Sequence, residues 1–270
     1  MKKNIFIKTR QYITFFAFLI IGILLFSAVA CKKKTSTPAI ETGTMTDRDG
    51  NVYTTVKIGN QWWMSQDLKV KTFLNGDSVT YKPSTIAWQD TTSGYCIYDT
   101  TASTIIGLLY NWYAVNDTRK LAPAGWHIPS DIEWKILELT LGMSVAQVDS
   151  VNWRGTNQGD QLKLGEFTNR PSGSWNYCDA YGPANNSPLP PGTQIVWPTN
   201  SSGFSAMAGN CRLFNGILGA PTGYGATGFW WSSTMEEGKA FYRYLDYNKP
   251  NVFRYFGDKR YGFSIRCVKD

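Results

Sequence analysis

Residues 49–64 read DGNVYTTVKIGNQWWM, and this stretch decides the fold because two turn signals enclose an alternating segment. Val52, Thr54, Val56 and Ile58 recur at every second residue, which is the period of a β-strand with one buried face. The Asp-Gly pair before the segment and the Gly-Asn pair after it favour tight turns between antiparallel strands. We therefore predict that the folded part of the chain opens with a β-meander.

Two acidic residues, Asp47 and Asp49, give the first of these turns half the pattern of a calcium-binding loop. The complete pattern requires further acidic ligands, notably a Glu at the twelfth position, and the sequence lacks them. We therefore interpret this segment as a hairpin turn and predict no metal site.

Alternating segments return in the last third of the chain, where Gly or Asn-Lys-Pro turns separate residues 229–234, 240–245, 251–256 and 262–268. These segments predict a terminal antiparallel sheet. We expect the adjacent Trp230 and Trp231 to point one into the core and one to the surface, because successive strand residues face opposite sides.

A strong helix start lies between the two sets of strands, in the sequence PSDIEW at residues 129–134. Ser130 can cap the free backbone N–H groups while Glu133 reaches back, and this capping box begins a helix that ends before Gly142. A second, shorter helix is predicted over residues 107–115, and segments rich in Gly, Asn and Pro beyond Gly142 predict loops. The expected buried face of the first helix consists of Ile132, Trp134, Ile136, Leu137 and Leu139.

These elements predict an α+β fold with short antiparallel sheets, two main helices and long loops. Residues 45–270 contain no linker long enough to divide them, so we expect one domain there. Strands at both ends of this domain allow the first and last strands to pair.

Residues 1–30 have the composition of an export signal, with a basic start followed by an apolar run over residues 13–30. The sequence Ala-Val-Ala-Cys resembles a bacterial lipobox, in which Cys31 becomes the lipidated first residue of the mature chain. An ordinary signal peptidase also accepts Ala-x-Ala, and an uncleaved apolar run of this length can reach across a bilayer. Residues 31–44 are polar and are predicted to form a tether.

The charge balance argues against a nucleic-acid partner. The 270 residues include 27 Lys and Arg, 20 Asp and Glu, and one His, which gives a net charge of +7. Seven of the basic residues lie in residues 1–34, which contain no acidic residue, so residues 35–270 are neutral overall. The single His also excludes a metal centre that needs several imidazoles.

Further motifs follow the opening meander in a recognisable order; they are Leu109-Tyr110-Asn111-Trp112, Pro123-x-Gly125-Trp126-His127-Ile128-Pro129-Ser130, Gly203-Phe204-Ser205-Ala206, Trp230-Trp231-Ser232-Ser233 and Tyr261-Gly262-Phe263-Ser264-Ile265-Arg266-Cys267-Val268. With the opening stretch, they resemble the Fibrobacter succinogenes major paralogous domain family over nearly all of residues 45–270. That family is more distantly similar to formylglycine-generating enzymes and C-type-lectin-like domains, which share similar helix-start and closing-strand motifs. The resemblance implies a C-type-lectin-like fold and says little about activity.

The same resemblance suggests an oxidase related to the formylglycine-generating enzymes as an alternative function. Those enzymes use two closely placed cysteines late in the domain, whereas Cys211 and Cys267 are far apart in this sequence. A triad of His127, Ser130 and Asp131 is conceivable, but capping already explains Ser130. We therefore expect no enzymatic activity and no cofactor. Two thiols, or His127 with a carboxylate, in an open pocket would instead favour the oxidase.

The cysteines suggest disulfides. Lipidation of Cys31 would leave four cysteines, and an even number permits two disulfides in an exported protein. Three connectivities are possible, and the expected one pairs Cys96 with Cys267 and Cys178 with Cys211. Metal binding by these thiols is less expected, because the sequence contains no Cys-x-x-Cys pair.

The chain near its C-terminus alternates Tyr, Asn and Asp with basic residues, a composition typical of recognition surfaces. In some C-type-lectin-like proteins this terminal region is the ligand-binding face. Half-buried strands of any small sheet would show the same alternation without binding a ligand. Calcium-dependent sugar binding is not expected, because the Glu-Pro-Asn, Gln-Pro-Asp and Trp-Asn-Asp tripeptides are absent. The candidate ligand-binding residues are Trp231, Tyr242, Tyr244, Asp246, Tyr247, Asn248, Asn251, Phe253, Tyr255, Asp258 and Tyr261.

The sequence thus predicts an exported lipoprotein, anchored to the bacterial outer membrane through Cys31, that acts as a non-catalytic binding module. Its ligand would be a glycan, a protein or another envelope component, and nucleic acid is not an expected partner. The alternatives are the oxidase described above and a structural surface or adhesion component.

Overall fold

The opening stretch forms the predicted β-meander from β1 (Thr42–Thr46), β2 (Val52–Ile58) and β3 (Gln61–Met64), which pair antiparallel in this order. The turn between β1 and β2 is held by the Asp47 carboxylate, which accepts hydrogen bonds from backbone N–H groups two and four residues later. Gly50 completes the turn with a φ of 84°, in the left-handed region that favours glycine. The segment is therefore a hairpin turn, as the sequence predicted.

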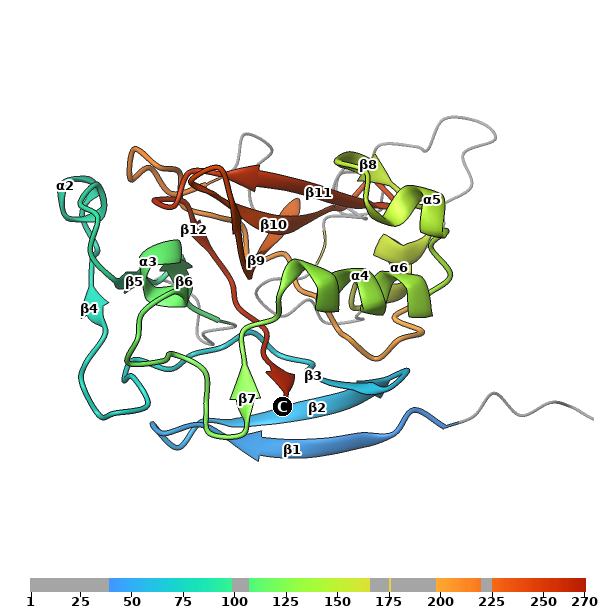
Figure 1. Cartoon of the computed structure of the whole chain (residues 1–270), viewed down its shortest axis with the longest axis horizontal. Helices are drawn as coiled ribbons and strands as arrows, with labels where there is room; N and C mark the ends of the chain where they lie inside the picture. Colours follow the sequence, from blue (N-terminus) through green and yellow to red (C-terminus); the bar gives the residue numbers. More distant parts are fainter. Residues whose placement is uncertain (1–38, 99–106, 166–174, 176–197, 220–224) are drawn as a thin grey trace, which may run out of the picture. The chain divides into compact units, whose positions relative to one another are not determined.

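The computed structural model describes residues 39–98, 107–165, 175, 198–219 and 225–270. Ile40–Asp270 form one unit with an α+β fold that consists mainly of sheet (Figure 1). Residues 1–30, Cys31 and most of the expected tether lie outside the described residues. Within the residues described, no helix is long and apolar enough to cross a membrane.

The expected tether is too long by three residues. It was predicted to extend to residue 44, but β1 begins at Thr42 and pairs with β2 from there. The polar Thr and Gly residues of this segment join the sheet because β2 offers them an unpaired edge with matching register.

The first sheet is closed by the end of the chain. Its strand order is β1-β2-β3-β13-β7, where β13 is Val268–Lys269 and β7 is Trp126–His127. Val268 lies opposite Trp63 on one side and His127 on the other. The last strand therefore pairs with the opening meander, as predicted, and the chain end lies between β3 and β7 in Figure 1.

The second sheet is the predicted terminal antiparallel sheet. Its strand order is β8-β11-β10-β9, where the strands are β8 (Asn152–Arg154), β9 (Thr227–Glu236), β10 (Lys239–Asp246) and β11 (Val252–Gly257). All neighbouring strands of this sheet are antiparallel. Residues 262–268, predicted as a further strand here, instead supply β13 and one strand of the third sheet.

The third sheet has the order β12-β6-β5-β4, where the strands are β4 (Thr80–Tyr81), β5 (Gly94–Cys96), β6 (Leu109–Asn111) and β12 (Gly262–Phe263). Its β4–β5 pair is parallel, although only antiparallel sheets were expected. The helix predicted over residues 107–115 is also wrong in its first half, which forms β6. Asn111 ends this strand and caps α3 (Trp112–Val115) through its side chain, so the helix is confined to one turn.

The predicted capping box begins α4 (Asp131–Thr140). The Ser130 side chain accepts a hydrogen bond from the Glu133 N–H, and the Glu133 carboxylate accepts one from the Ser130 N–H. It is the one described helix longer than five residues, although two main helices were expected; the others are α2 (Thr85–Trp88), α3, α5 (Val145–Val148) and α6 (Gln158–Leu162).

The buried face of α4 differs from the prediction. Trp134 and Leu137 are buried as expected, but Ile132, Ile136 and Leu139 are exposed. The helix buries the charged side chains of Asp131 and Glu138 in their place, because the facing sheet presents arginines to the helix. Hydrophobic periodicity cannot reveal a buried face that is partly ionic.

Both adjacent tryptophans of β9 are buried, so the expected exposure of one of them is wrong. Trp230 and Trp231 do point to opposite faces, but each face is covered by a separate hydrophobic cluster. The indole N–H groups are also satisfied inside, since Trp230 donates to Asp67 and Trp231 donates to the Tyr110 carbonyl.

The expected disulfide between Cys96 and Cys267 is absent. Both residues are buried free thiols, and they belong to different hydrophobic clusters, so their side chains do not meet. Cys211 is also a free, buried thiol, and its expected partner Cys178 lies outside the described residues.

Candidate functional site

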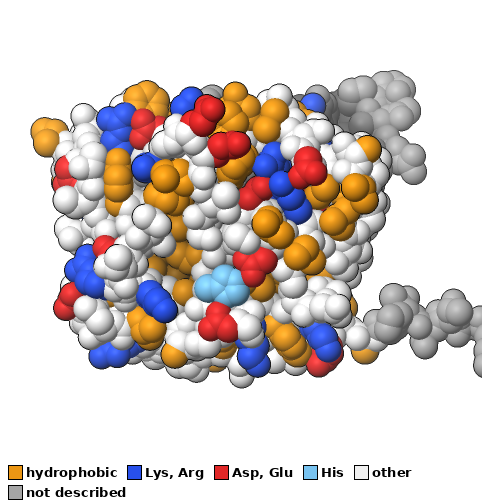
Figure 2. All heavy atoms as spheres, in the orientation of Figure 1, with side chains coloured by type: hydrophobic (Ala, Val, Ile, Leu, Met, Phe, Trp, Pro, Cys, Tyr) orange, Lys and Arg blue, Asp and Glu red, His pale blue; other side chains and the backbone are white. Residues whose placement is uncertain are grey.

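The chain's single imidazole lies at the surface, where β7 approaches the start of α4 (Figure 2). His127 Nδ1 lies 2.6 Å from the Asp270 carboxylate, and Nε2 lies 2.6 Å from the Glu133 carboxylate. Partial burial would lower the pKa of His127, but the hydrogen bonds to Asp270 and Glu133 outweigh it and raise this pKa. Both ring nitrogens are thereby engaged, and the imidazole ties the chain end to the capping box of α4.

The conceivable triad does not assemble. The Ser130 hydroxyl donates to Glu133 at 2.7 Å, and the carboxylate of Asp131 binds arginines inside the protein. The thiols are no better placed for chemistry, because burial raises the pKa of Cys96 to about 11 and that of Cys211 to about 12. Thiols of this kind carry almost no thiolate at neutral pH and are weak nucleophiles.

The second sheet has two chemically different faces, and the strand register shows why. Tyr242 of β10 lies opposite Tyr255 of β11 and Trp231 of β9, whereas the next residue, Arg243, lies opposite Arg254 and Trp230. Because successive residues point to opposite faces, the rings gather on one side of the sheet and the arginines on the other. The aromatic face consists of Trp153, Phe229, Trp231, Tyr242, Tyr244, Phe253 and Tyr255.

The opposite side, the arginine face, binds α4 through a buried ionic network. Arg243 donates to Glu138 at 2.7 Å and to Asp131 at 2.8 Å, while Arg254 makes two bonds to Asp131 and Arg154 binds Glu138 at 2.5 Å. Burial alone would raise the pKa of Asp131, but the hydrogen bond from Arg254 and the charge of Arg243 hold it well below its usual range. This network holds the arginine face of the second sheet against α4.

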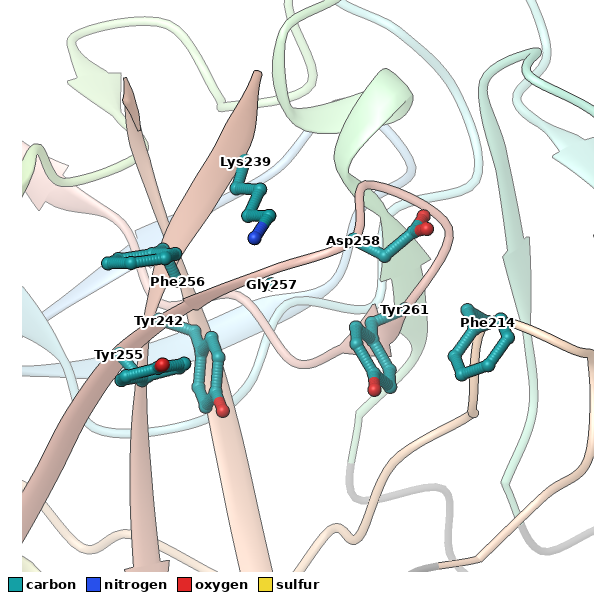
Figure 3. Close-up of a pocket in the computed structure, with 8 residues that line it drawn as sticks. All are labelled: Phe214, Lys239, Tyr242, Tyr255, Phe256, Gly257, Asp258 and Tyr261. Carbon is teal, nitrogen blue, oxygen red and sulfur yellow. The ribbon is translucent and has the colours of Figure 1, made fainter. Parts of the chain in front are cut away.

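An open cavity of about 290 Å³ lies where β10 begins and β11 ends (Figure 3). In Figure 3 the rings of Tyr242 and Tyr261 stand on either side of Gly257, with Tyr255 beyond one and Phe214 beyond the other. The lining residues are Phe214, Lys239, Tyr242, Tyr255, Phe256, Gly257, Asp258 and Tyr261. We call this cavity the aromatic pocket.

Gly257 lets the two central rings of the aromatic pocket approach the backbone. A Cβ atom at this position would lie 3.2 Å from the Tyr261 ring and 3.3 Å from the Tyr242 ring. Both distances are tighter than ordinary van der Waals contacts, so any larger residue would push the rings apart. The shape of the pocket therefore depends on this glycine.

Three phenol hydroxyls reach the aromatic pocket, from Tyr242, Tyr255 and Tyr261. Within the part of the chain that the structure describes, these three hydroxyls make no hydrogen bond. The tyrosine hydroxyls that do make one belong to other residues. Burial raises the pKa of Tyr242 and Tyr261 above the usual value, so both phenols stay uncharged at neutral pH. The pocket thus presents hydroxyls that can both donate and accept hydrogen bonds.

One positive and one negative side chain line the aromatic pocket. The Lys239 ammonium lies 5.4 Å from the centroid of the Phe256 ring. The Asp258 carboxylate accepts bonds from the Arg260 backbone N–H and guanidinium at 2.9, 3.0 and 2.6 Å. These bonds from Arg260 outweigh partial burial and lower the pKa of Asp258. The carboxylate is therefore already neutralised by its own neighbour.

Ring contacts continue from the aromatic pocket across the sheet. Tyr255 stacks on Phe256 with centroids 4.6 Å apart, Phe253 follows at 5.9 Å from Tyr255, and Trp153 lies 5.3 Å from Phe253. We call these four residues the aromatic row. The row leads from the pocket, along β11, to the edge strand β8.

The structure divides the sequence-predicted site residues into separate groups. Tyr242, Tyr255, Asp258 and Tyr261 come together in the aromatic pocket, and Phe253 lies beside it in the aromatic row. Tyr244 packs against two rings of this row, 5.6 Å from Phe253 and 5.0 Å from Trp153, and the other predicted residues lie elsewhere.

Two of these are buried. Trp231 belongs to the core, and Asp246 accepts a hydrogen bond from the Tyr244 hydroxyl. Tyr247, Asn248 and Asn251 lie in or beside the turn between β10 and β11, at the opposite end of these strands from the pocket.

Four lining residues were missed by sequence reasoning: Phe214, Lys239, Phe256 and Gly257. Phe214 comes from a loop that precedes the sheet, and no local pattern connects it with β11. By strict alternation Phe256 should face away from Tyr255, but the two rings stack at the end of the strand. Gly257 gave the one usable signal, since a glycine among aromatic residues marks a close approach to the backbone.

The family model described as Fibrobacter succinogenes major domain matches residues 56–269 of the chain. No curated protein matches the sequence, and no solved structure matches the fold.

Proposed function

The chain belongs to the Fibrobacter succinogenes major domain family, and we propose that it is a non-catalytic binding module of the bacterial cell envelope. The observation that carries this proposal is the aromatic pocket, in which five rings and three phenol hydroxyls, without a hydrogen-bond partner among the described residues, surround an open cavity. Concave sites that are mostly apolar with a few polar groups are the usual form of a ligand site.

The rigid support of the sheet that carries the aromatic pocket also favours binding. The sheet that carries Tyr242 and Tyr255 is fixed from its other face by the ionic network around Arg243 and Arg254. Rings held on a rigid sheet lose little conformational freedom when a ligand arrives, and this favours affinity.

We propose the envelope location from residues 1–44, in which an export signal precedes Cys31 and a polar tether. Lipidation of Cys31 would hold the module at the outer membrane, and the tether would let the aromatic pocket reach ligands. Metabolic labelling with a fatty acid tests this: the wild-type chain should be labelled and Cys31→Ser should not.

We also propose that the fold is C-type-lectin-like. The supporting features are the pairing of the last strand with the opening meander and the capped helix between the two sets of strands. An experimental structure compared with C-type-lectin-like domains tests this, and a different strand connectivity would contradict it.

The absence of catalysis is part of the proposal. It is supported by the burial of Cys96, Cys211 and Cys267 and by the raised pKa of these thiols. His127 has carboxylate partners, but it is not among the residues that line the aromatic pocket. Neither the buried thiols nor the position of His127 favours the oxidase.

Binding of the purified chain to isolated cell envelopes tests the proposed function. We expect Tyr255→Ala and Tyr261→Ala to reduce retention about tenfold or more, because each removes a ring that would bury ligand surface. The matched control is Tyr81→Ala, which removes an exposed ring that lies on the edge strand of the third sheet and does not line the pocket. Equal retention of all three variants would contradict the proposal.

A further inference from the structure

We propose that the aromatic pocket and the aromatic row bind an uncharged saccharide chain. This inference rests on the proposed binding function and specifies the chemistry of its ligand. A saccharide has apolar C–H faces and a rim of hydroxyl groups, and both features have counterparts among the described residues.

The rings supply surfaces for the apolar faces. Tyr242, Tyr255, Phe256, Tyr261 and Phe214 present flat carbon surfaces to one open cavity. Covering them removes apolar area from water, which is favourable, and their flat shape suits a ring-shaped ligand. In Figure 3 the Tyr242 and Tyr261 rings stand on either side of Gly257, and the Phe263 ring packs against both with centroids 5.0 and 5.3 Å away, so a sugar would rest on the open surfaces of these rings.

The hydroxyls of the pocket suit a ligand that is itself rich in hydroxyls. Those of Tyr242, Tyr255 and Tyr261 have no hydrogen-bond partner within the part of the chain that the structure describes. The raised pKa of Tyr242 and Tyr261 keeps each phenol able to donate as well as accept. A ligand hydroxyl has the same dual capacity, so each contact satisfies both groups.

The charges disfavour ionic ligands. Aromatic cages can bind quaternary ammonium groups, but Lys239 places a positive charge in the lining and would repel them. The Asp258 carboxylate does not offset this, since Arg260 already neutralises it. One lysine also falls short of the cation cluster that selects phosphate or sulfate groups. The remaining choice is an uncharged ligand.

The aromatic row indicates a chain rather than a single sugar. Beyond Phe256 the contacts continue through Tyr255 and Phe253 to Trp153 on the edge strand. Tyr255 is exposed, while Phe253 and Trp153 are half-buried with part of their surface open to solvent. A saccharide seated in the pocket can therefore extend over further rings.

Calorimetric titration of the full chain, purified in detergent, tests the inference. The probes are neutral gluco-, manno- and xylo-oligosaccharides from disaccharide to hexasaccharide, a sulfated oligosaccharide and tetramethylammonium. We expect binding of at least one neutral series, with an affinity that rises about tenfold or more from the disaccharide to the hexasaccharide. Stronger binding of the sulfated probe or of tetramethylammonium would overturn the inference.

Four variants locate the ligand. Tyr255→Ala should weaken every length about tenfold or more, and Tyr242→Phe should weaken binding severalfold through loss of one hydroxyl while keeping the ring. Trp153→Ala should weaken the hexasaccharide and leave the disaccharide unchanged, because only the longer chain reaches β8. Tyr81→Ala should change nothing. Cooperative thermal unfolding of each variant establishes that it is folded.

The outcomes separate the two proposals. If no saccharide binds but Tyr255→Ala still abolishes retention on envelopes, the binding function stands and the saccharide inference is wrong. If pocket variants alter neither saccharide binding nor retention, both proposals are wrong. If Trp153→Ala weakens all lengths equally or none, the ligand does not follow the aromatic row.

Discussion

At the scale of single residues, the charges buried between α4 and the second sheet are the most consequential. Glu138 is fully buried and is shared by Arg154 and Arg243, while Asp131 is shared by Arg243 and Arg254. Two carboxylates and three guanidinium groups thus exclude water together. Each charge is stable inside only because its partners are present.

We predict that Glu138→Gln lowers the free energy of unfolding by about 3–5 kcal/mol, because Arg154 would remain buried without its counter-ion and Arg243 would lose one of its two. Urea unfolding followed by circular dichroism measures this. The matched control is Glu41→Gln, which breaks an exposed ion pair with Lys57 and should cost less than about 1 kcal/mol. Equal losses in the two variants would show that the network does not stabilise the fold.

His127 supplies a pH-dependent contribution to stability. Its raised pKa means that the stability contributed by its carboxylate partners is fully present below its ordinary value of 6.5 and is lost as the pH rises through the raised value. Glu133 remains ionised at about pH 5, because hydrogen bonds from Ser130 outweigh burial and lower its pKa.

We therefore expect His127→Gln to lower the free energy of unfolding more at about pH 5 than at about pH 9. The side chain is 41 % exposed, so solvent screening limits the difference to about 0.5–1 kcal/mol. Denaturant melts of the wild type and the variant at both pH values measure it. A loss that is the same at both pH values would contradict the assigned ion pairs.

At the scale of elements, the contribution of the α4 capping box to stability can be measured separately from that of the rest of the helix. We predict that Ser130→Ala costs about 1 kcal/mol, because the Glu133 N–H at the start of α4 loses its acceptor. Ser144 precedes α5 in the same way but makes no capping bond, so Ser144→Ala should change stability by only a few tenths of a kcal/mol. Thermal melts compare the two, and similar shifts would refute the capping role.

Elements with a local signal were predictable from sequence. The meander at residues 49–64 and the start of α4 were correct because turn residues and caps act through their immediate neighbours. The orientation of α4 was not predictable, since Ile132 faces solvent and Glu138 binds Arg243, which lies 105 residues away in the sequence. The same distinction applies to the aromatic pocket. The alternating sequence near the C-terminus predicted its tyrosines, whereas no local pattern indicated Phe214.

At the scale of the whole molecule, the final residues bind the sheets together. Gly262–Phe263 complete the third sheet and Val268–Lys269 lie inside the first. Between them, Ile265 and Cys267 fill the core, and Arg266 binds Asp67 at 2.7 Å. The segment therefore contributes to more than one sheet and to the core at once.

We predict that a chain lacking residues 262–270 shows no cooperative unfolding transition, because the core loses buried side chains, the first sheet loses an interior strand and the third sheet loses an edge strand. Differential scanning calorimetry measures the transition. A chain lacking Lys269 and Asp270 alone is the control; it loses exposed residues and the contact with His127, and it should still melt cooperatively. A cooperative transition in the longer deletion would show that the fold is complete without its last strands.

The position of β13 between β3 and β7 also sets the order in which the protein can mature. A polypeptide that emerges gradually from the ribosome exposes residue 268 only after every strand of the other two sheets. Until then Trp63 and His127 have no strand between them, and the first sheet cannot close. The first sheet is therefore the last of the three to receive all its strands.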